Sequence, residues 1–255
     1  MKHFIVCICA VTLLVNCKQK DTSKETIPPP PPPVKEYPAA IASVFDAHGG
    51  ITKWNAMNNL CFIMEKEAGN ETHTIDLKSR KARIETDKFT LGFDGEKVWL
   101  DQDSTYFAPQ RARFYHNLMF YFYAMPFVLG DEGIIYEKTS PLVFDGISYP
   151  GIKISYKDSI GMSPDDNYFI YYSENTYQME WLGYTVTYFD KQASSDIHFT
   201  RYPEWEKVGG LLLPKSMIWY KQQEDGTLKE TEGSVAFLNA QVSQSEKEPA
   251  FYNQN

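Results

Sequence analysis

Two pairs of closely spaced carboxylates have the residue type with which a calcium-binding loop begins. They are Asp101 with Asp103, and Asp165 with Asp166. A loop of the EF-hand kind also needs a glycine for its sharp turn and a glutamate as its last, bidentate ligand. Neither pair is followed by these residues at the required spacing. We therefore expect solvated turns at both places and no metal site.

His48 is a single side chain whose type suits acid–base chemistry or contact with a ligand. It ends the stretch 39–48, which is predicted to form a helix, and an imidazolium at a helix C-terminus meets the negative end of the helix dipole. We favour this structural role over a site role. The sequence contains no HExxH, GxSxG or P-loop motif and no GxGxxG after a strand. We expect no catalytic residue, no cofactor and no enzyme activity, although acid–base pairs from distant strands would leave no local motif.

A covalent lipid is the modification that the N-terminus indicates. The apolar run over residues 4–15 is too short to cross a bilayer as a helix and is typical of the core of a signal peptide. The sequence L-V-N-C at residues 14–17 resembles the lipobox of bacterial lipoproteins, in which the cysteine thiol is acylated and becomes the first mature residue. Asn16 departs from the small residue usual there, and an ordinary signal-peptidase site of the A-x-A kind is missing. We expect residues 1–16 to be a lipoprotein signal peptide and Cys17 to hold the protein on a membrane.

The segment Arg111–Leu129 is the most apolar and aromatic part of the chain after the signal peptide. On a helical wheel, Phe114, Leu118 and Phe122 fall on one stripe, and further apolar side chains fill most of the remaining surface. A helix that is apolar nearly all round must be covered on more than one side. Its cover is the protein's own sheet, a partner, a membrane surface or an apolar ligand, and this choice decides the function.

Arg111 and Arg113 stand at the start of this predicted helix, where the helix dipole disfavours cations. Their placement therefore needs another cause. We favour pairing with some of the chain's surplus carboxylates over contact with an anionic headgroup whose acyl chains lie along the apolar stripe. The candidate ligand-binding residues are Trp99, Arg111, Arg113, Phe114, Leu118, Met119, Phe122 and Met125.

The bulk composition limits the classes of protein that this chain can form. Its 255 residues are 43% hydrophobic and 15% aromatic, enough to bury a sizeable core as one large β domain. The formal net charge is −8 and the sequence has no basic stripe, which argues against a nucleic-acid partner. Cys61 is the only cysteine after residue 17, so we expect no internal disulfide and no cysteine-based metal site.

Residues 17–37 are predicted to form a tether between the lipid and the domain. The segment is polar and ends close to the proline run 28–33, and consecutive prolines adopt the extended polyproline II conformation. The tether is either a semi-rigid spacer or a disordered leader with no tuned length, and both alternatives stay open.

The domain over residues 38–240 is predicted to be mainly β. From residue 60 the hydrophobic period changes to two, which is typical of half-buried antiparallel strands. Asp94-Gly95 predicts a two-residue type I′ turn, and Asp145-Gly146 predicts a second hairpin. Residues 241–255 are predicted to be a polar C-terminal tail.

The expected architecture is a strongly curved antiparallel sheet or half-open barrel of about eleven strands. The N-terminal helix ends at Gly49-Gly50, because glycine adopts the left-handed conformation that a helix end favours. We expect this helix and the central aromatic helix to cover the concave face of the sheet, since an exposed apolar face must be buried against another element.

Several short motifs follow one another in an order that resembles a known family. They are the lipobox at Cys17, Ala47-His48-Gly49-Gly50 with Trp54, Phe93-Asp94-Gly95 before Val98-Trp99, Met125-Pro126-Phe127-Val128-Leu129 with Asp131 and Gly133, Asp145-Gly146, and Gly209-Gly210-Leu211-Leu212-Leu213-Pro214. This order resembles the LolA/LolB-like lipoprotein-carrier superfamily, and within it a family of uncharacterised envelope lipoproteins typical of Bacteroidetes. The superfamily resemblance implies a half-open antiparallel barrel closed by helices over an apolar cavity that binds acyl chains or a lipidated partner. The narrower family implies no established activity.

Together these observations predict a lipid-anchored lipoprotein of the bacterial cell envelope. We expect it to bind a hydrophobic ligand, a lipid or an acyl chain, in a half-barrel cavity without catalysis. The alternative is a structural or interaction module with a filled core and an envelope protein partner, and an unrecognised enzyme is the third possibility. In the family that the chain resembles, lipoproteins exported to the cell surface often carry an acidic cluster after the acylated cysteine. No such cluster directly follows Cys17, so the resemblance favours a position in the outer membrane facing the periplasm.

Overall fold

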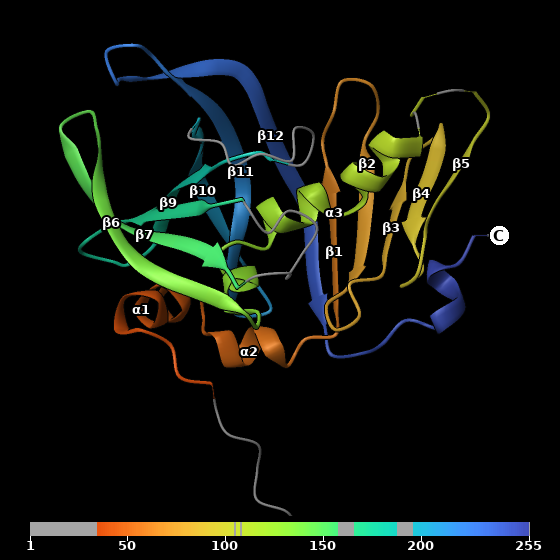
Figure 1. Cartoon of the computed structure of the whole chain (residues 1–255). Coiled ribbons are helices and arrows are strands. Elements are labelled where there is room, and N and C mark those ends of the chain that lie inside the picture. Colours follow the sequence, from red (N-terminus) through yellow and green to blue (C-terminus); the bar gives the residue numbers. More distant parts are fainter. Residues whose placement is uncertain (1–34, 105, 108, 158–165, 188–195, 255) are drawn as a thin grey trace, which may run out of the picture. The chain divides into compact units, whose positions relative to one another are not determined.

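Twelve strands pair into one antiparallel sheet with the order β5-β4-β3-β2-β1-β12-β11-β10-β9-β8-β7-β6. The computed structural model describes residues 35–104, 106–107, 109–157, 166–187 and 196–254. The predicted signal peptide, Cys17 and the proline run lie outside the described residues. Within the unit Tyr37–Asn255 the sheet curves strongly and stays open between β5 and β6 (Figure 1). The predicted mainly β, half-open antiparallel architecture is confirmed, with twelve strands where about eleven were expected.

The strands follow the alternation of apolar and polar residues in the sequence. They are β1 (Asn59–Met64), β2 (Glu71–Asp76), β3 (Ala82–Glu85), β4 (Phe89–Phe93), β5 (Val98–Gln102), β6 (Ile134–Phe144), β7 (Ile147–Tyr156), β8 (Tyr168–Tyr172), β9 (Met179–Tyr184), β10 (His198–Val208), β11 (Leu211–Gln222) and β12 (Leu228–Ser243). The helices are α1 (Ala39–Ala47), α2 (Ile51–Asn55) and α3 (Pro109–Tyr123), with the short 3₁₀ helices η1 (Phe127–Gly130) and η2 (Pro249–Tyr252). No helix among these described elements is both long and apolar enough to cross a bilayer.

The two Asp-Gly pairs form different turns. Asp145 and Gly146 have φ values of 50° and 77°, so they make the expected tight hairpin between β6 and β7. The prediction of a type I′ turn at Asp94-Gly95 is wrong. Such a turn needs a positive φ at both residues, and Gly95 has one (103°) while Asp94 does not. Instead, the Asp94 carboxylate accepts the backbone N–H of Lys97 at 2.9 Å, and the side chain thereby closes a longer loop.

Helix α1 buries the face that its sequence predicts, with Ile41, Val44 and Phe45 in the core. His48 follows its last turn, as expected, but the mechanism differs. The imidazole is fully buried, its Nδ1 donates to the Val44 carbonyl at 2.8 Å, and burial lowers the pKa of His48 to about 4. The ring is therefore neutral near pH 7, so the expected attraction between an imidazolium and the helix dipole is wrong.

The glycine pairs at residues 49–50 and 209–210 lie against each other in the fold. The backbone N–H of Leu212 donates to the His48 carbonyl at 2.8 Å. Gly49 has a φ of 103°, and a Cβ atom there would stand 2.5 Å from the Gly210 carbonyl oxygen. Only glycine satisfies both demands, so this contact fixes α1 to the turn between β10 and β11.

The segment predicted as a polar tail from residue 241 packs onto the sheet through its described residues, 241–254. Strand β12 continues to Ser243, and η2 buries Tyr252, whose hydroxyl donates to Asn59 Oδ1 at 2.8 Å. The Tyr252 carbonyl accepts the indole N–H of Trp99 at 2.9 Å. The domain therefore does not end at residue 240.

Helix α3 lies inside the curve of the sheet, as predicted (Figure 1). It begins at Pro109 and ends at Tyr123, where the chain turns through a cis peptide bond between Met125 and Pro126 into η1. Helix α3 and η1 together connect β5, at one free edge of the sheet, to β6, at the other free edge.

Candidate ligand-binding site

Helix α3 presents two different apolar faces. On the first face, Met119, Phe120 and Tyr123 are buried in the main core. Tyr123 stacks on Phe62 of β1 with ring centroids 4.1 Å apart, and it meets Phe237 of β12 edge-on at 4.6 Å. These aromatic contacts hold the helix against the concave face at the centre of the sheet.

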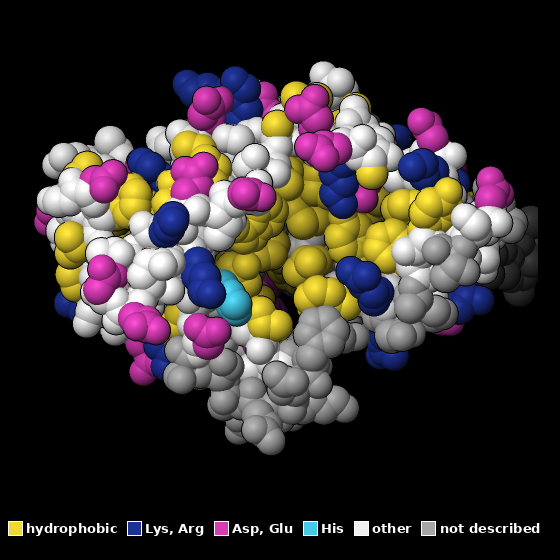
Figure 2. All heavy atoms as spheres, turned by 90° about the horizontal axis from the view of Figure 1, so that it is seen from above, with side chains coloured by type: hydrophobic (Ala, Val, Ile, Leu, Met, Phe, Trp, Pro, Cys, Tyr) yellow, Lys and Arg dark blue, Asp and Glu magenta, His cyan; other side chains and the backbone are white. Residues whose placement is uncertain are grey.

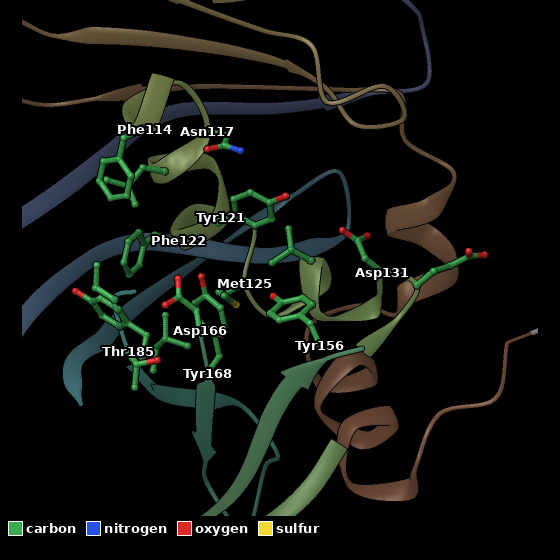
Figure 3. A pocket seen from close by; sticks show the side chains of 16 residues that line it. Phe114, Asn117, Tyr121, Phe122, Met125, Asp131, Tyr156, Asp166, Tyr168 and Thr185 are labelled. Carbon is green, nitrogen blue, oxygen red and sulfur yellow. The ribbon is translucent and has the colours of Figure 1, made fainter. Parts of the chain in front are cut away.

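The second face lines a cavity of about 320 Å³. Phe114, Leu118 and Phe122 reach it from α3, and Met125 reaches it from the turn that follows (Figure 3). A volume near the lower end of the range typical of ligand pockets, roughly 300–1,000 Å³, suits a small or slender ligand. The aromatic rings of α3 therefore do not fill the concave face, and the helix is a wall of a cavity.

The rest of the cavity wall comes from η1, from the segment before β6, and from the ends of β7, β8 and β9. From above, the molecule is hollowed between its two halves, and hydrophobic side chains line the hollow while most charged side chains lie around it (Figure 2). The lining residues are Phe114, Asn117, Leu118, Tyr121, Phe122, Met125, Val128, Asp131, Glu132, Tyr156, Asp166, Tyr168, Leu182, Tyr184, Thr185 and Val186.

Three tyrosines reach the cavity from the ends of neighbouring strands. Tyr156 ends β7, Tyr168 begins β8 and Tyr184 ends β9, and antiparallel pairing places these three positions at one rim. Tyr121 of α3 belongs to the same lining. We call these four residues the tyrosine rim.

The hydroxyls of the tyrosine rim stay protonated. Burial raises the pKa of Tyr156 and Tyr168 above the usual range, and nearby groups that include the Asp166 carboxylate raise both values further. Burial likewise raises the pKa of Tyr121 and Tyr184. Tyr121, Tyr156 and Tyr168 therefore offer neutral hydroxyls that both donate and accept hydrogen bonds.

The charged residues of the lining, among the residues that the structure describes, are all carboxylates. Arg80 Nη2 donates to both oxygens of Asp131 at 2.7 Å, which fixes that side chain at the wall. Asp166 is buried and accepts the backbone N–H of Thr187 at 2.7 Å, so the solvated turn expected at Asp166 is wrong. Glu132 is exposed at the edge of the cavity.

The structure brings together Phe114, Leu118, Phe122 and Met125 among the predicted ligand-binding residues. The others lie elsewhere, for reasons that local geometry gives. Met119 is buried in the core, because it falls on the opposite face of α3.

Trp99 and the two arginines of the prediction are also outside the lining. Trp99 alternates along β5 with Leu100, which packs near Ala112 of α3, so Trp99 belongs to the other face of the sheet. Arg111 and Arg113 are exposed, and neither forms a salt bridge with another described residue. The pairing with carboxylates that we favoured for them is therefore not found within the described part of the chain.

Sequence reasoning missed the tyrosine rim and the buried Asp166. These residues are far apart in the chain and meet only through the antiparallel order of β7, β8 and β9. One signal was available, because Tyr156, Tyr168 and Tyr184 each stand at the boundary between an apolar run and a turn. Placing them at one rim requires the strand order as well as the boundaries.

A second group of polar residues surrounds Glu71 in β2. The Glu71 carboxylate accepts hydrogen bonds from Lys66 Nζ (2.7 Å), Tyr115 Oη (2.6 Å) and His73 Nε2 (3.2 Å). Lys66 also donates to the Tyr115 hydroxyl at 2.7 Å. We call these four residues the Glu71 cluster.

The Glu71 cluster contains a histidine–carboxylate pair, the kind of pair that would suggest an enzyme. Burial alone would raise the pKa of Glu71, but the hydrogen bonds from His73, Lys66 and Tyr115 outweigh burial and lower it to about 2. His73 is 1% exposed and Glu71 is 4% exposed, and neither lines the cavity. Both side chains are buried away from the cavity, and the hydrogen bond from Tyr115 to Glu71 ties α3 to β2.

Comparisons with solved structures give remote likenesses. A LolA superfamily protein from Nitrosomonas europaea is 8% identical over 83% of this chain and 96% of that chain, with a TM-score of 0.47. A DUF1329 family protein from Desulfovibrio piger has the same identity and coverage and a TM-score of 0.42. A domain described as an outer membrane lipoprotein-sorting protein from Vibrio parahaemolyticus is 9% identical over 80% of this chain and 97% of that chain, with a TM-score of 0.38. Because all three TM-scores are below 0.5, function has to be argued from this chain's own residues.

No curated protein sequence matches the chain. A family model described as a family of unknown function, DUF6503, matches residues 62–204. The matched region runs from β1 into β10 and so includes α3 and every residue of the cavity lining.

Proposed function

We propose that this chain, which belongs to DUF6503, a family of unknown function, binds a hydrophobic ligand in the cavity beside α3 without catalysis. The ligand is an acyl chain or a similar lipid tail. One observation carries this proposal. The stripe of Phe114, Leu118 and Phe122 lines a cavity between α3 and the sheet. When an apolar ligand removes the apolar side chains of an open cavity from water, the free energy of the system falls.

The wall opposite this stripe supports the same function. Met125, Val128 and Leu182 line the cavity, so a hydrocarbon chain inside it would have apolar partners on several sides. The described part of the cavity lining contains no histidine, and the histidine–carboxylate pair of His73 and Glu71 belongs to the Glu71 cluster. Binding is therefore the activity that the geometry supports best.

The place of action that we propose is the cell envelope, with the protein held on a membrane through a lipid on Cys17 and facing the periplasm. The lipobox sequence at residues 14–17 supports this proposal. Fractionation of cells that express Cys17→Ala tests it, and we expect the variant to leave the membrane fraction. An unchanged distribution would contradict the anchor and leave the cavity proposal intact.

Cavity binding is tested with N-phenyl-1-naphthylamine, an uncharged hydrophobic dye that fluoresces in apolar surroundings. Leu118→Trp places a bulky ring in the cavity, and we expect it to weaken dye binding by the full-length chain about tenfold or more. Arg113→Trp is the matched control, because it introduces the same ring on an exposed position of the same helix. We expect the control to bind the dye within about twofold of the wild type.

Solvent extraction of the purified chain, followed by mass spectrometry, identifies any amphiphile that copurifies. Equal dye binding by both tryptophan variants would place the dye outside the cavity. No dye binding by the wild type, together with no extracted amphiphile, would favour the alternative of an interaction module that has a protein partner.

A further inference from the structure

The polar groups of the cavity carry charge of one sign. Asp131, Glu132 and Asp166 line it, and the described lining contains no lysine, arginine or histidine. Arg80 is a neighbouring cation, but it is bound to the Asp131 carboxylate at 2.7 Å and lies over the Phe120 ring at 5.1 Å. These two contacts hold its guanidinium against Asp131 and Phe120.

Apolar and polar groups both line the cavity. Phe114 and Phe122 lie on one side and Asp131 with Tyr156 on the other, while Asp166 and Tyr168 lie nearer to Phe122 (Figure 3). Such a mixed lining matches an amphiphile, which has an apolar chain and a polar end. The charge and the hydrogen-bonding groups of the protein then select which polar end is accepted.

A cationic polar end is suited to both kinds of polar group in the lining. Carboxylate oxygens accept short, charge-assisted hydrogen bonds from an ammonium group. Tyrosine rings attract cations through the negative potential of their faces, and Tyr121, Tyr156, Tyr168 and Tyr184 bring such rings to the lining. A carboxylate or phosphate headgroup would meet like charge in a partly buried site, where water screens the repulsion poorly.

We propose that the cavity selects a single-chain amphiphile with a cationic ammonium headgroup over the same chain with an anionic headgroup. The chain lies along the α3 stripe, and the ammonium lies between the cavity carboxylates and the tyrosine rim. This inference rests on the proposed function, because it assigns a ligand class to the same cavity. It differs from the role considered for Arg111 and Arg113, which required an anionic headgroup.

Displacement of N-phenyl-1-naphthylamine from the full-length chain tests the inference with three ligands that share one chain. Decylammonium, decanol and decanoate are compared at pH 7, below their micellar concentrations and in moderate salt. We expect decylammonium to bind about tenfold or more tightly than decanoate, with decanol between them. Decanol or decanoate binding more tightly than decylammonium would overturn the inference.

Charge removal at the cavity assigns the preference to the carboxylates. Glu132→Gln removes one exposed charge at little risk to folding, and we expect it to reduce the preference for decylammonium about threefold. Adding Asp166→Asn, which keeps an oxygen to accept the Thr187 N–H, should reduce it further. Glu204→Gln is the control, since it removes the same charge from β10 at a residue outside the cavity lining.

The outcomes separate the headgroup inference from the proposed function. Displacement by all three ligands with equal affinity, or an unchanged preference in Glu132→Gln and in the double variant, overturns the headgroup inference alone. If the dye binds but none of the three ligands displaces it, the headgroup inference also fails. If the dye does not bind and no amphiphile is extracted from the purified chain, the proposed function fails as well.

Discussion

Helix α3 carries one tyrosine into each of two groups of polar residues, and the two groups differ in how far their hydrogen bonds are satisfied. Tyr115 joins the Glu71 cluster, where lysine, histidine and tyrosine donors surround one carboxylate. Tyr121 joins the cavity, where Tyr156 and Tyr168 make no hydroxyl hydrogen bond with another described residue. The side-chain types are alike, so residue type alone does not tell a structural network from a binding site.

The Glu71 cluster and the cavity differ in whether the protein itself supplies the hydrogen-bond partners. Within the Glu71 cluster the chain supplies them from β2, α3 and the segment after β1. In the cavity the chain supplies the walls and leaves a volume of about 320 Å³ between them. The cluster should therefore govern stability, while the cavity should govern binding.

The largest effect should come from removing the centre of the cluster. Glu71→Leu leaves Lys66, His73 and Tyr115 without their shared acceptor, and we expect it to lower the free energy of unfolding by about 3–5 kcal/mol. Urea denaturation measures this change. Glu132→Gln in the cavity is the control and should change stability by less than about 0.5 kcal/mol. A similar loss in both variants would remove the distinction between the two groups.

The dependence of stability on acidic pH should also distinguish the Glu71 cluster from the cavity. Hydrogen bonds lower the pKa of Glu71 in the folded protein from 4.5 to about 2, so the unfolded chain binds a proton more readily than the folded one. The stabilisation is present above pH 4.5 and is lost as the pH falls from 4.5 towards 2, by about 3 kcal/mol. The difference in unfolding free energy between wild type and Glu71→Gln, measured across this pH range, reports it. A difference that stays constant with pH would contradict the assignment.

The smallest effect compares one substitution in both places. Tyr115→Phe removes a donor from a buried carboxylate, and we expect it to cost about 1.5–3 kcal/mol of stability. Tyr168→Phe removes a hydroxyl that faces the cavity, and we expect it to cost less than about 1 kcal/mol. Thermal and urea unfolding of the two variants measure both costs. Tyr168→Phe being the more destabilising change would show that the cavity wall is part of the folded core.

The architecture was predictable because it depends on local signals. Alternating apolar residues predicted the strands, and the apolar segment after Arg111 predicted a helix inside the curve of the sheet. The hairpin at Asp145-Gly146 followed from its residue types. The loop at Asp94 did not, because its side chain bonds the backbone of Lys97 and so offers an alternative to the tight turn.

The site was only partly predictable, because half of its wall depends on strand order. The stripe of Phe114, Leu118 and Phe122 followed from helical spacing within one segment. Tyr156 and Asp166 come from separate strands and turns, and no spacing in the sequence relates them to α3. The prediction that Trp99 lines the ligand site failed for a related reason. Alternation along a strand shows which residues share a face, but it does not show which face is the inner one.

The pairing of β1 with β12 at the middle of the sheet has a consequence for the order in which the protein folds. Asn59 bonds to Ser245, 186 residues further along the chain, while the neighbouring strand pairs mostly form between strands that follow each other. Closing so long a loop costs chain entropy before any contact compensates for it, and such pairings form slowly. Strands β1–β5 and β6–β11 can each assemble as a growing meander during synthesis. The pairing of β1 with β12 needs both groups of strands, so we expect the seam at the centre of the sheet to form late.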